Sequence, residues 1–182
     1  MNFYKYGSLP NLISLARLML VPAIISLIVA GRWKEACVVF VIAGVSDALD
    51  GWIAKTFNLR TELGAYLDPL ADKALIVSIY VTLAIVGAIP ATIAIIVVSR
   101  DLMIVAAFMV SWLLATPLEV KPLLISKLNT LVQILFAALA LSVEAFGVHK
   151  GAWFGILLYV VAGLALASLG AYLAQWIRHM SA

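Results

Sequence analysis

Six long apolar runs, separated by short polar segments, dominate the pattern of the chain. Each run is close to the roughly 20 residues that an α-helix needs to cross a bilayer. The pattern therefore predicts an all-α fold, that of a polytopic membrane protein with six transmembrane helices. Residues 1–182 are expected to form a single membrane domain, because no polar stretch is long enough for a soluble one. The runs are Leu9 to Ala30, Ala36 to Ala54, Leu63 to Ala88, Ile89 to Ala115, Pro122 to Gly147 and Trp153 to Ile177.

Composition strengthens this interpretation. Hydrophobic residues make up 65% of the chain and charged residues 12%, about half the charged share of an average soluble domain. The single cysteine, Cys37, excludes an internal disulfide and is expected to pack in the second run. The first run is too long for a cleaved signal peptide and is expected to remain in the mature protein. A formal charge of +3 gives no reason to expect a nucleic-acid partner.

The basic residues between the runs predict an orientation. Six spans would place five basic residues on the side of the N-terminus and three on the other. The positive-inside rule then puts the N-terminus and the loop after the second span in the cytoplasm, in an inner or cytoplasmic membrane. The first group is Lys5, Lys55, Arg60, Lys121 and Arg178, and the second is Arg32, Lys34 and Lys150.

Four aspartates, Asp47, Asp50, Asp68 and Asp72, interrupt the second and third runs. One carboxylate at the centre of a bilayer costs roughly 2.5 to 3.5 kcal/mol, so four would cost about as much as the net stability of a typical protein. Their charge must therefore be compensated by a partner, and a metal ion is the partner that best suits four acids.

The spacing of these aspartates predicts two facing pairs. Asp47 and Asp50 are three residues apart and Asp68 and Asp72 four apart, so each pair shares one helix face. An antiparallel hairpin that turns near residue 59 would set Asp50 level with Asp68 and Asp47 level with Asp72. At about 1.5 Å per residue, the cluster would lie about 13 to 18 Å from the turn, in a cavity near the cytoplasmic side.

The available ligands at this cluster are all oxygens, because the two histidines, His149 and His179, lie at span ends. Carboxylate oxygens favour Mg²⁺, Mn²⁺ or Ca²⁺ over zinc or copper. One or two such ions, with Mg²⁺ or Mn²⁺ preferred, could bind a diphosphate and stabilise a leaving phosphate. Two other interpretations stay open: carboxylates paired with lysines such as Lys55 and Lys73, and a proton path in a small ion or proton transporter.

These residues resemble the signature of the CDP-alcohol phosphatidyltransferase family, Asp-x2-Asp-Gly-x2-Ala-Arg-x8-Gly-x3-Asp-x3-Asp. Seven of its eight positions match, and the exception is Lys55 in place of arginine. Lysine keeps the charge but loses the planar fork that grips phosphate. The resemblance extends to residues 9–12 with Arg17, to residues 68–73, and to residues 99–101.

The resemblance implies a six-helix membrane enzyme, usually a homodimer, that transfers the phosphatidyl group of CDP-diacylglycerol to an alcohol and releases CMP. Asp47, Asp50 and Asp68 are then expected to bind metal. Asp72 would complete the metal site or act as general base, so Asp68 and Asp72 are the expected catalytic residues. The donor nucleotide is expected to contact Gly51, Ala54, Lys55, Gly64 and Asn11. Lys55 could instead extend to the membrane surface as a helix-end lysine.

Three basic residues within the apolar runs, Arg17, Arg100 and Lys127, are candidates for binding the acceptor's phosphate. Alternatively, they could be neutralised by Asp101, which follows Arg100, or by the four aspartates. The polar stretch Ser126 to Gln133 needs partners as well, either a bound headgroup or interhelical hydrogen bonds.

Residues 124–130, together with Gln133, are similar to the CMP-forming cardiolipin synthase branch, which joins CDP-diacylglycerol to phosphatidylglycerol. The sequence therefore predicts acidic phospholipid biosynthesis with phosphatidylglycerol as the preferred acceptor. Phosphatidylglycerophosphate synthases, which use glycerol 3-phosphate, resemble the chain nearly as closely and remain an alternative. A small transporter and a structural membrane scaffold are the alternatives from other classes.

Overall fold

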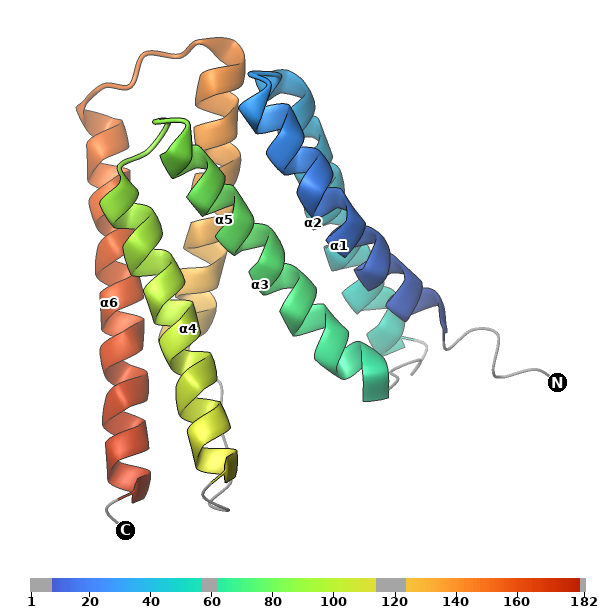
Figure 1. Cartoon of the computed structure of the whole chain (residues 1–182), viewed down its shortest axis with the longest axis vertical. Coiled ribbons are helices and arrows are strands. Elements are labelled where there is room, and N and C mark those ends of the chain that lie inside the picture. Colours follow the sequence, from blue (N-terminus) through green and yellow to red (C-terminus); the bar gives the residue numbers. More distant parts are fainter. Residues whose placement is uncertain (1–7, 57–61, 114–123, 181–182) are drawn as a thin grey trace, which may run out of the picture.

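The protein is described here by a computed structural model, which covers residues 8–56, 62–113 and 124–180. These ranges contain six α-helices and no strand, so the all-α prediction is confirmed for them (Figure 1). Every helix end lies within three residues of the end of the corresponding apolar run. The helices are α1 (Ser8–Val29), α2 (Trp33–Thr56), α3 (Glu62–Ile85), α4 (Ala91–Leu113), α5 (Leu124–Phe146) and α6 (Ala152–Met180).

Three short connections, α1 to α2, α3 to α4 and α5 to α6, lie together at one end of the bundle, which we call the turn end (Figure 1). Each contains a glycine with positive φ: Gly31 (70°), Gly87 (77°) and Gly147 (64°). Such a residue lets the chain leave a helix while its last carbonyls stay hydrogen-bonded. For example, the Arg32 N–H donates to the Leu27 carbonyl over 2.9 Å.

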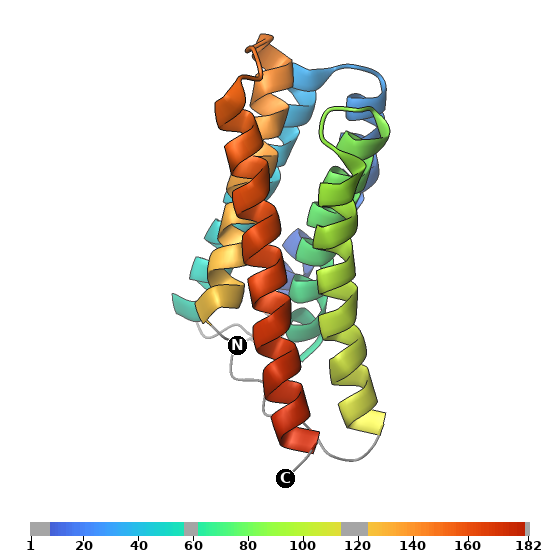
Figure 2. The same ribbon diagram turned by 90° about the vertical axis from the view of Figure 1, so that its left-hand side faces the viewer.

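The helices pack in a closed arrangement. Helix α1 packs against α2 and α3, and α5 packs against α2, α3 and α6, while α4 packs against α3 and α6. Figures 1 and 2 show α6 running steeply beside α4 and beside α5, with α3 crossing obliquely toward α1. Helix α3 therefore touches both the α1 side and the α4 side of the bundle. The second half of the aspartate motif lies on this helix.

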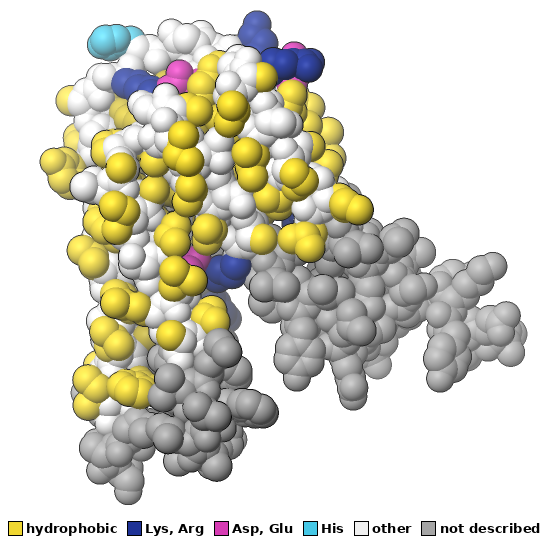
Figure 3. All heavy atoms as spheres, viewed as in Figure 1, with side chains coloured by type: hydrophobic (Ala, Val, Ile, Leu, Met, Phe, Trp, Pro, Cys, Tyr) yellow, Lys and Arg dark blue, Asp and Glu magenta, His cyan; other side chains and the backbone are white. Residues whose placement is uncertain are grey.

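Apolar side chains fill the interior and also cover the outside. Ile24, Ile79, Leu83 and Leu141 are buried, whereas large hydrophobic residues such as Ile85 remain exposed. Figure 3 shows hydrophobic atoms along the sides of the bundle, with most visible charged atoms at the turn end. Large exposed apolar areas are unusual for a soluble monomer and mark contact with a partner or lipid.

Two of the described helical segments, Leu124–Phe146 and Ala152–Ile177, are long and apolar enough to cross a membrane. Two further apolar segments, Ala16–Val29 and Lys73–Ile85, are shorter within the range whose side chains the structure describes. Six transmembrane spans therefore stay a prediction, whereas six helices are observed.

Candidate active site

The aspartate motif lies on α2 and α3, as its spacing predicted. Helix α2 ends at Thr56 and α3 begins at Glu62, so the two helix ends lie three residues on either side of residue 59. Helix α2 carries Asp47, Asp50, Gly51, Ala54 and Lys55, and α3 carries Gly64, Asp68 and Asp72. The side chains of these residues and of Asn11 lie outside the described part of the structure, so the facing of the two pairs stays a prediction.

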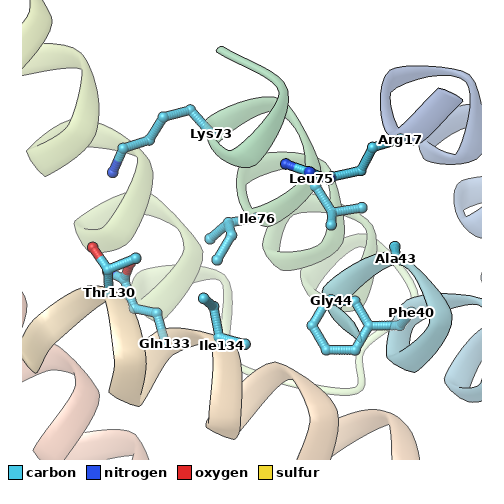
Figure 4. A pocket seen from close by; sticks show the side chains of 10 residues that line it. All are labelled: Arg17, Phe40, Ala43, Gly44, Lys73, Leu75, Ile76, Thr130, Gln133 and Ile134. Carbon is cyan, nitrogen blue, oxygen red and sulfur yellow. The ribbon is translucent and has the colours of Figure 1, made fainter. Parts of the chain in front are cut away.

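A cavity of about 70 Å³, which we call the inner cavity, lies between α1, α2, α3 and α5 (Figure 4). This is room for a few water molecules or for part of a small ligand. Most of its lining is apolar, with Arg17, Lys73, Thr130 and Gln133 as the polar members. The complete described lining is Arg17, Phe40, Ala43, Gly44, Lys73, Leu75, Ile76, Thr130, Gln133 and Ile134.

Helical periodicity connects the inner cavity to the motif. Phe40, Ala43 and Gly44 form one stripe of α2, because residues three and four apart share a helix face. Position 47 is the next on that stripe, three residues after Gly44. On α3, position 72 precedes Leu75 and Ile76 by three and four residues. The motif therefore begins about one helical turn beyond the cavity on both helices.

The α5 side of the cavity holds buried amides. The side chains of Asn129 and Gln133 are completely buried. Within the described part of the chain, none of their four amide oxygen and nitrogen atoms has a hydrogen-bond partner. Tyr80 donates to the backbone carbonyl of Gln133 over 3.1 Å and so ties α3 to α5. Gln133 is also one of the residues that line the inner cavity, so a ligand or water there is a candidate partner for its amide.

The three predicted acceptor-binding cations occupy different surroundings. Arg17 is buried and lines the inner cavity, into which it points from α1 in Figure 4. Arg100 is equally buried, on α4. Lys127 is exposed on α5. The structure thus brings Arg17 to the cavity, whereas Lys127 lies at the surface and Arg100 has other partners.

Those partners define the Arg100 cluster, which consists of Lys73, Arg100, Asp101, Ser126 and Ser168. Arg100 Nη1 donates to Asp101 Oδ1, while Nη2 donates to Ser126 Oγ over 2.6 Å and to Ser168 Oγ over 2.7 Å. Lys73 Nζ donates to the same Asp101 oxygen over 2.7 Å. The cluster therefore joins α3, α4, α5 and α6. The ion pair between Arg100 and Asp101 is the contact that the alternative interpretation expected, and Lys73 is a second cation on the same carboxylate.

Two contacts of this cluster could not be predicted from the sequence: the one between Ser168 and Arg100, and the one between Lys73 and Asp101. Ser168 is completely buried and lies 68 residues from Arg100 in the chain, in a helix of small and apolar residues. Lys73 was considered only as a possible partner of the motif carboxylates, and its bond to Asp101, 28 residues away, was not predicted. The sequence signal nearest to these contacts was the polar start of α5, Ser126 to Gln133, which does not indicate Ser168 or Lys73.

Comparison with known protein families decides the class. The family model described as CDP-alcohol phosphatidyltransferase matches residues 7–174. The chain belongs to this family. The match covers all of the motif and most of the described helices, from α1 into α6.

Individual members of the family are also similar to the chain. A human protein named cardiolipin synthase (CMP-forming) is 36% identical over 181 residues, which is 91% of this chain and 60% of the relative. A rice protein named chloroplastic CDP-diacylglycerol--glycerol-3-phosphate 3-phosphatidyltransferase 1 is 32% identical over 186 residues, covering 92% and 56%. A Mycobacterium tuberculosis protein named probable phosphatidylglycerophosphate synthase is 32% identical over 104 residues, covering 54% and 50%. The chain thus spans between half and three fifths of the length of these relatives.

The family generally uses divalent metal ions, and the donor set of this chain fits such an ion. The cavity's described charged residues, Arg17 and Lys73, are both cations and cannot ligate a metal. Among the side chains that the structure describes, no group of three or more histidine, cysteine, aspartate or glutamate residues is present. The motif carboxylates, Asp47, Asp50, Asp68 and Asp72, are oxygen donors of the kind that such an ion takes, and they are the residues that would hold it.

Proposed function

We propose that the protein transfers the phosphatidyl group of CDP-diacylglycerol to a hydroxyl group of an acceptor and releases CMP. The observation that carries this proposal is the position of the motif. The chain belongs to the family, and its aspartate motif on α2 and α3 begins one helical turn beyond a cavity that is lined by Arg17 and Lys73. Cations beside a group of acids suit a reaction between two phosphate-containing substrates.

The motif acids would carry the chemistry. Asp47, Asp50 and Asp68 would hold one or two Mg²⁺ or Mn²⁺ ions, which when bound supply positive charge to the diphosphate of the donor. Asp72 would complete that site or accept the proton of the acceptor hydroxyl. The acceptor oxygen forms a bond to the phosphorus next to diacylglycerol. The bond from that phosphorus to the bridging oxygen breaks, and CMP leaves with this oxygen and the bonding electrons.

The donor nucleotide would lie along the motif helices. Gly51, Ala54 and Gly64 carry little or no side chain and would allow the nucleotide to approach the backbone. Lys55 would face the diphosphate as a point charge, and Asn11 on α1 would contribute a polar group.

The preferred acceptor is phosphatidylglycerol, which makes the protein a cardiolipin synthase that forms CMP. Similarity to the human protein of that name over 91% of the chain supports this choice. Arg17, Arg100 and Lys127 are the proposed phosphate-binding cations, and Arg17 has the strongest support because it lines the inner cavity. Glycerol 3-phosphate is the second candidate acceptor, supported by the rice relative, which matches 92% of the chain.

We further propose that the enzyme is a homodimer in an inner or cytoplasmic membrane, with its active site facing the cytoplasm. The basic residues Arg32, Lys34 and Lys150 lie near the turn end, whereas the motif lies toward the opposite ends of α2 and α3. The larger predicted group of basic residues belongs to that opposite side.

The function is tested by offering the purified protein labelled CDP-diacylglycerol with either phosphatidylglycerol or glycerol 3-phosphate, in Mg²⁺ or in excess chelator. Metal-dependent CMP release with cardiolipin as the lipid product is expected. Phosphatidylglycerophosphate as the only product would replace the preferred acceptor by the second candidate. Undiminished turnover in excess chelator would contradict the metal-dependent mechanism.

Two substitutions sharpen the test, Asp68→Asn and Asp72→Asn, because each removes one charge at nearly constant shape. Each is expected to lower kcat at least about a hundredfold, as loss of a metal ligand or a general base does. Glu144→Gln, which neutralises an acid near the turn end, is the matched control and should retain activity. A transporter would instead give ion flux in proteoliposomes without CDP-lipid, and this flux would depend on the same aspartates.

A further inference from the structure

The Arg100 cluster has more positive than negative charge. Two cations, Lys73 and Arg100, share one carboxylate oxygen, Asp101 Oδ1, so the cluster carries a formal charge of +1. Arg100 and Asp101 are buried, with side-chain exposures of 2% and 5%. The buried pair of Arg100 and Asp101 is neutral by itself, so the unmatched positive charge belongs to Lys73, whose side chain is 38% exposed. An anion that reaches Lys73 would find a positive charge there without having to displace the buried pair.

Lys73 is the member of the cluster that reaches the inner cavity. It lines the cavity, and it is 38% exposed, in contrast to the other two charged members. Figure 4 shows its side chain extending from α3, away from Arg17. It also follows Asp72 directly in the chain. A positive charge that borders the cavity is thus held one residue from the motif by a carboxylate on a different helix, α4.

This placement matters because a lysine side chain is flexible. Its four-carbon stem carries about 2 kcal/mol of rotamer entropy when unrestrained. Without Asp101, the ammonium group would be free to move toward other carboxylates, and the nearest in sequence is Asp72. The bond from Lys73 to Asp101 fixes the cation beside the cavity before any substrate binds. A lysine that is already held in place binds an anion without the entropic cost of ordering its side chain at that moment.

We propose that Asp101 is a positioning residue of the acceptor site, which holds Lys73 and Arg100 in place for the phosphate group of the acceptor. The inference rests on the proposed function, and it assigns roles in acceptor binding to Asp101 and Lys73. Phosphatidylglycerol and glycerol 3-phosphate both carry the phosphate that this charge would meet. Asp101 itself acts through the two cations and contacts no substrate.

The test measures KM for donor and acceptor separately in Asp101→Asn, with phosphatidylglycerol in one series and glycerol 3-phosphate in the other. The apparent KM for the accepted acceptor is expected to rise about tenfold, while the KM for CDP-diacylglycerol changes less than about twofold. Asp101→Glu keeps the charge and is expected to recover part of the acceptor affinity. The series that responds identifies the source of the phosphate.

A second variant protects the test against loss of folding. Lys73→Gln removes only the partly exposed cation and leaves the Arg100 to Asp101 pair neutral and buried. It should fold and raise the acceptor KM as Asp101→Asn does. Glu144→Gln, which breaks the ion pair with Lys150 near the turn end, is the matched control and should leave both KM values unchanged.

Two results would overturn the inference. One is an unchanged acceptor KM in folded Lys73→Gln. The other is a loss of thermal stability in Asp101→Asn together with equal changes in the KM values for donor and acceptor, because a purely structural role of Asp101 predicts that result. Both require measurable CMP release by the unsubstituted protein. Absence of any CMP release would instead contradict the proposed function, so the two failures are distinguishable.

Discussion

The turn end and the Arg100 cluster use the same kinds of charged side chains in different surroundings. At the turn end, Arg32 pairs with Glu35 over 3.0 Å, and both side chains are about half exposed. Glu144 pairs with Lys150 in a partly exposed position. In the cluster, Arg100 and Asp101 are buried among four helices. Water screens the first kind of pair and is excluded from the second.

The charged residues at the turn end therefore stabilise helix ends at the surface, whereas those of the Arg100 cluster hold four helices together in the interior. Lys150 also donates to the Ala88 carbonyl over 2.8 Å and lies over the Phe154 ring, so it links two connections at the turn end. Each of these contacts could be replaced by water. Arg100 has no such replacement, because its partners are Asp101 and two serine hydroxyls in the interior. Substitutions at the two places should therefore differ strongly in effect.

The largest effect in this comparison is expected for Arg100→Met. The change leaves Asp101 with only Lys73 as a counter-charge and removes the donor to Ser126 and Ser168. Breaking a buried ion pair costs about 3 to 5 kcal/mol, which corresponds to a fall in apparent Tm of about 10 °C for a chain of this length. Thermal unfolding in detergent micelles measures it. The Tm of Arg100→Lys should lie between those of the unsubstituted protein and Arg100→Met. A fall in Tm of less than about 2 °C for Arg100→Met would contradict the description of the cluster as buried and tightly paired.

The next effect is expected at Gln133, whose buried amide lacks a partner in the described structure. Gln133→Leu keeps the size of the side chain and removes a buried polar group that costs about 1 to 3 kcal/mol when unsatisfied. The apparent Tm should rise by about 5 °C, while turnover with the acceptor falls about tenfold if the amide binds it. Thermal unfolding and CMP release measure the two changes.

Tyr80→Phe is the control for that experiment. It removes the hydrogen bond to the Gln133 carbonyl and leaves the amide in place, so it should lower the Tm by about 2 to 4 °C. A lower Tm with full turnover in Gln133→Leu would show that the amide has a structural role only.

The helices were predictable because their signals are local. An apolar run of about 20 residues needs only its own composition to be recognised, and the three turn-end glycines lie where the runs stop. The motif was predictable for the same reason, since its acids repeat at helical spacing on α2 and α3. Such features depend on neighbours three or four residues away.

Contacts between distant helices were not predictable in this way. Arg100, Ser126 and Ser168 come from three helices, and no short-range pattern links them. The pairing of Lys73 with Asp101 joins residues 28 positions apart, and no local pattern indicates it. Packing decides such partners, because α3 lies against α4 where both residues are found. One sequence alone contains no measure of that packing.

A smaller effect is expected for Glu144→Gln, which leaves Lys150 with the Ala88 carbonyl and the Phe154 ring as partners. A partly exposed pair contributes about 0.2 to 1 kcal/mol, so the apparent Tm should fall by on the order of 1 to 3 °C. CMP release should be unchanged. A loss of activity would show that the turn end influences the active site, and would contradict the expectation that its ion pairs are independent of that site.

The smallest effect is expected for Arg32→Gln at the turn end. In the folded protein the pKa of Glu35 is lowered from 4.5, mainly by a backbone hydrogen bond and next by the hydrogen bond from Arg32. A lowered pKa contributes stability above the unfolded pKa, and this stability is lost as the pH falls through the folded pKa. Because the backbone contribution remains in the variant and the pair is exposed, no measurable change in Tm is expected at pH 7. Tm measured from neutral to acidic pH checks this, since the curves of the two proteins should coincide at neutral pH and also once Glu35 is protonated. A shift at neutral pH as large as that of Glu144→Gln would mean that exposure does not separate these ion pairs.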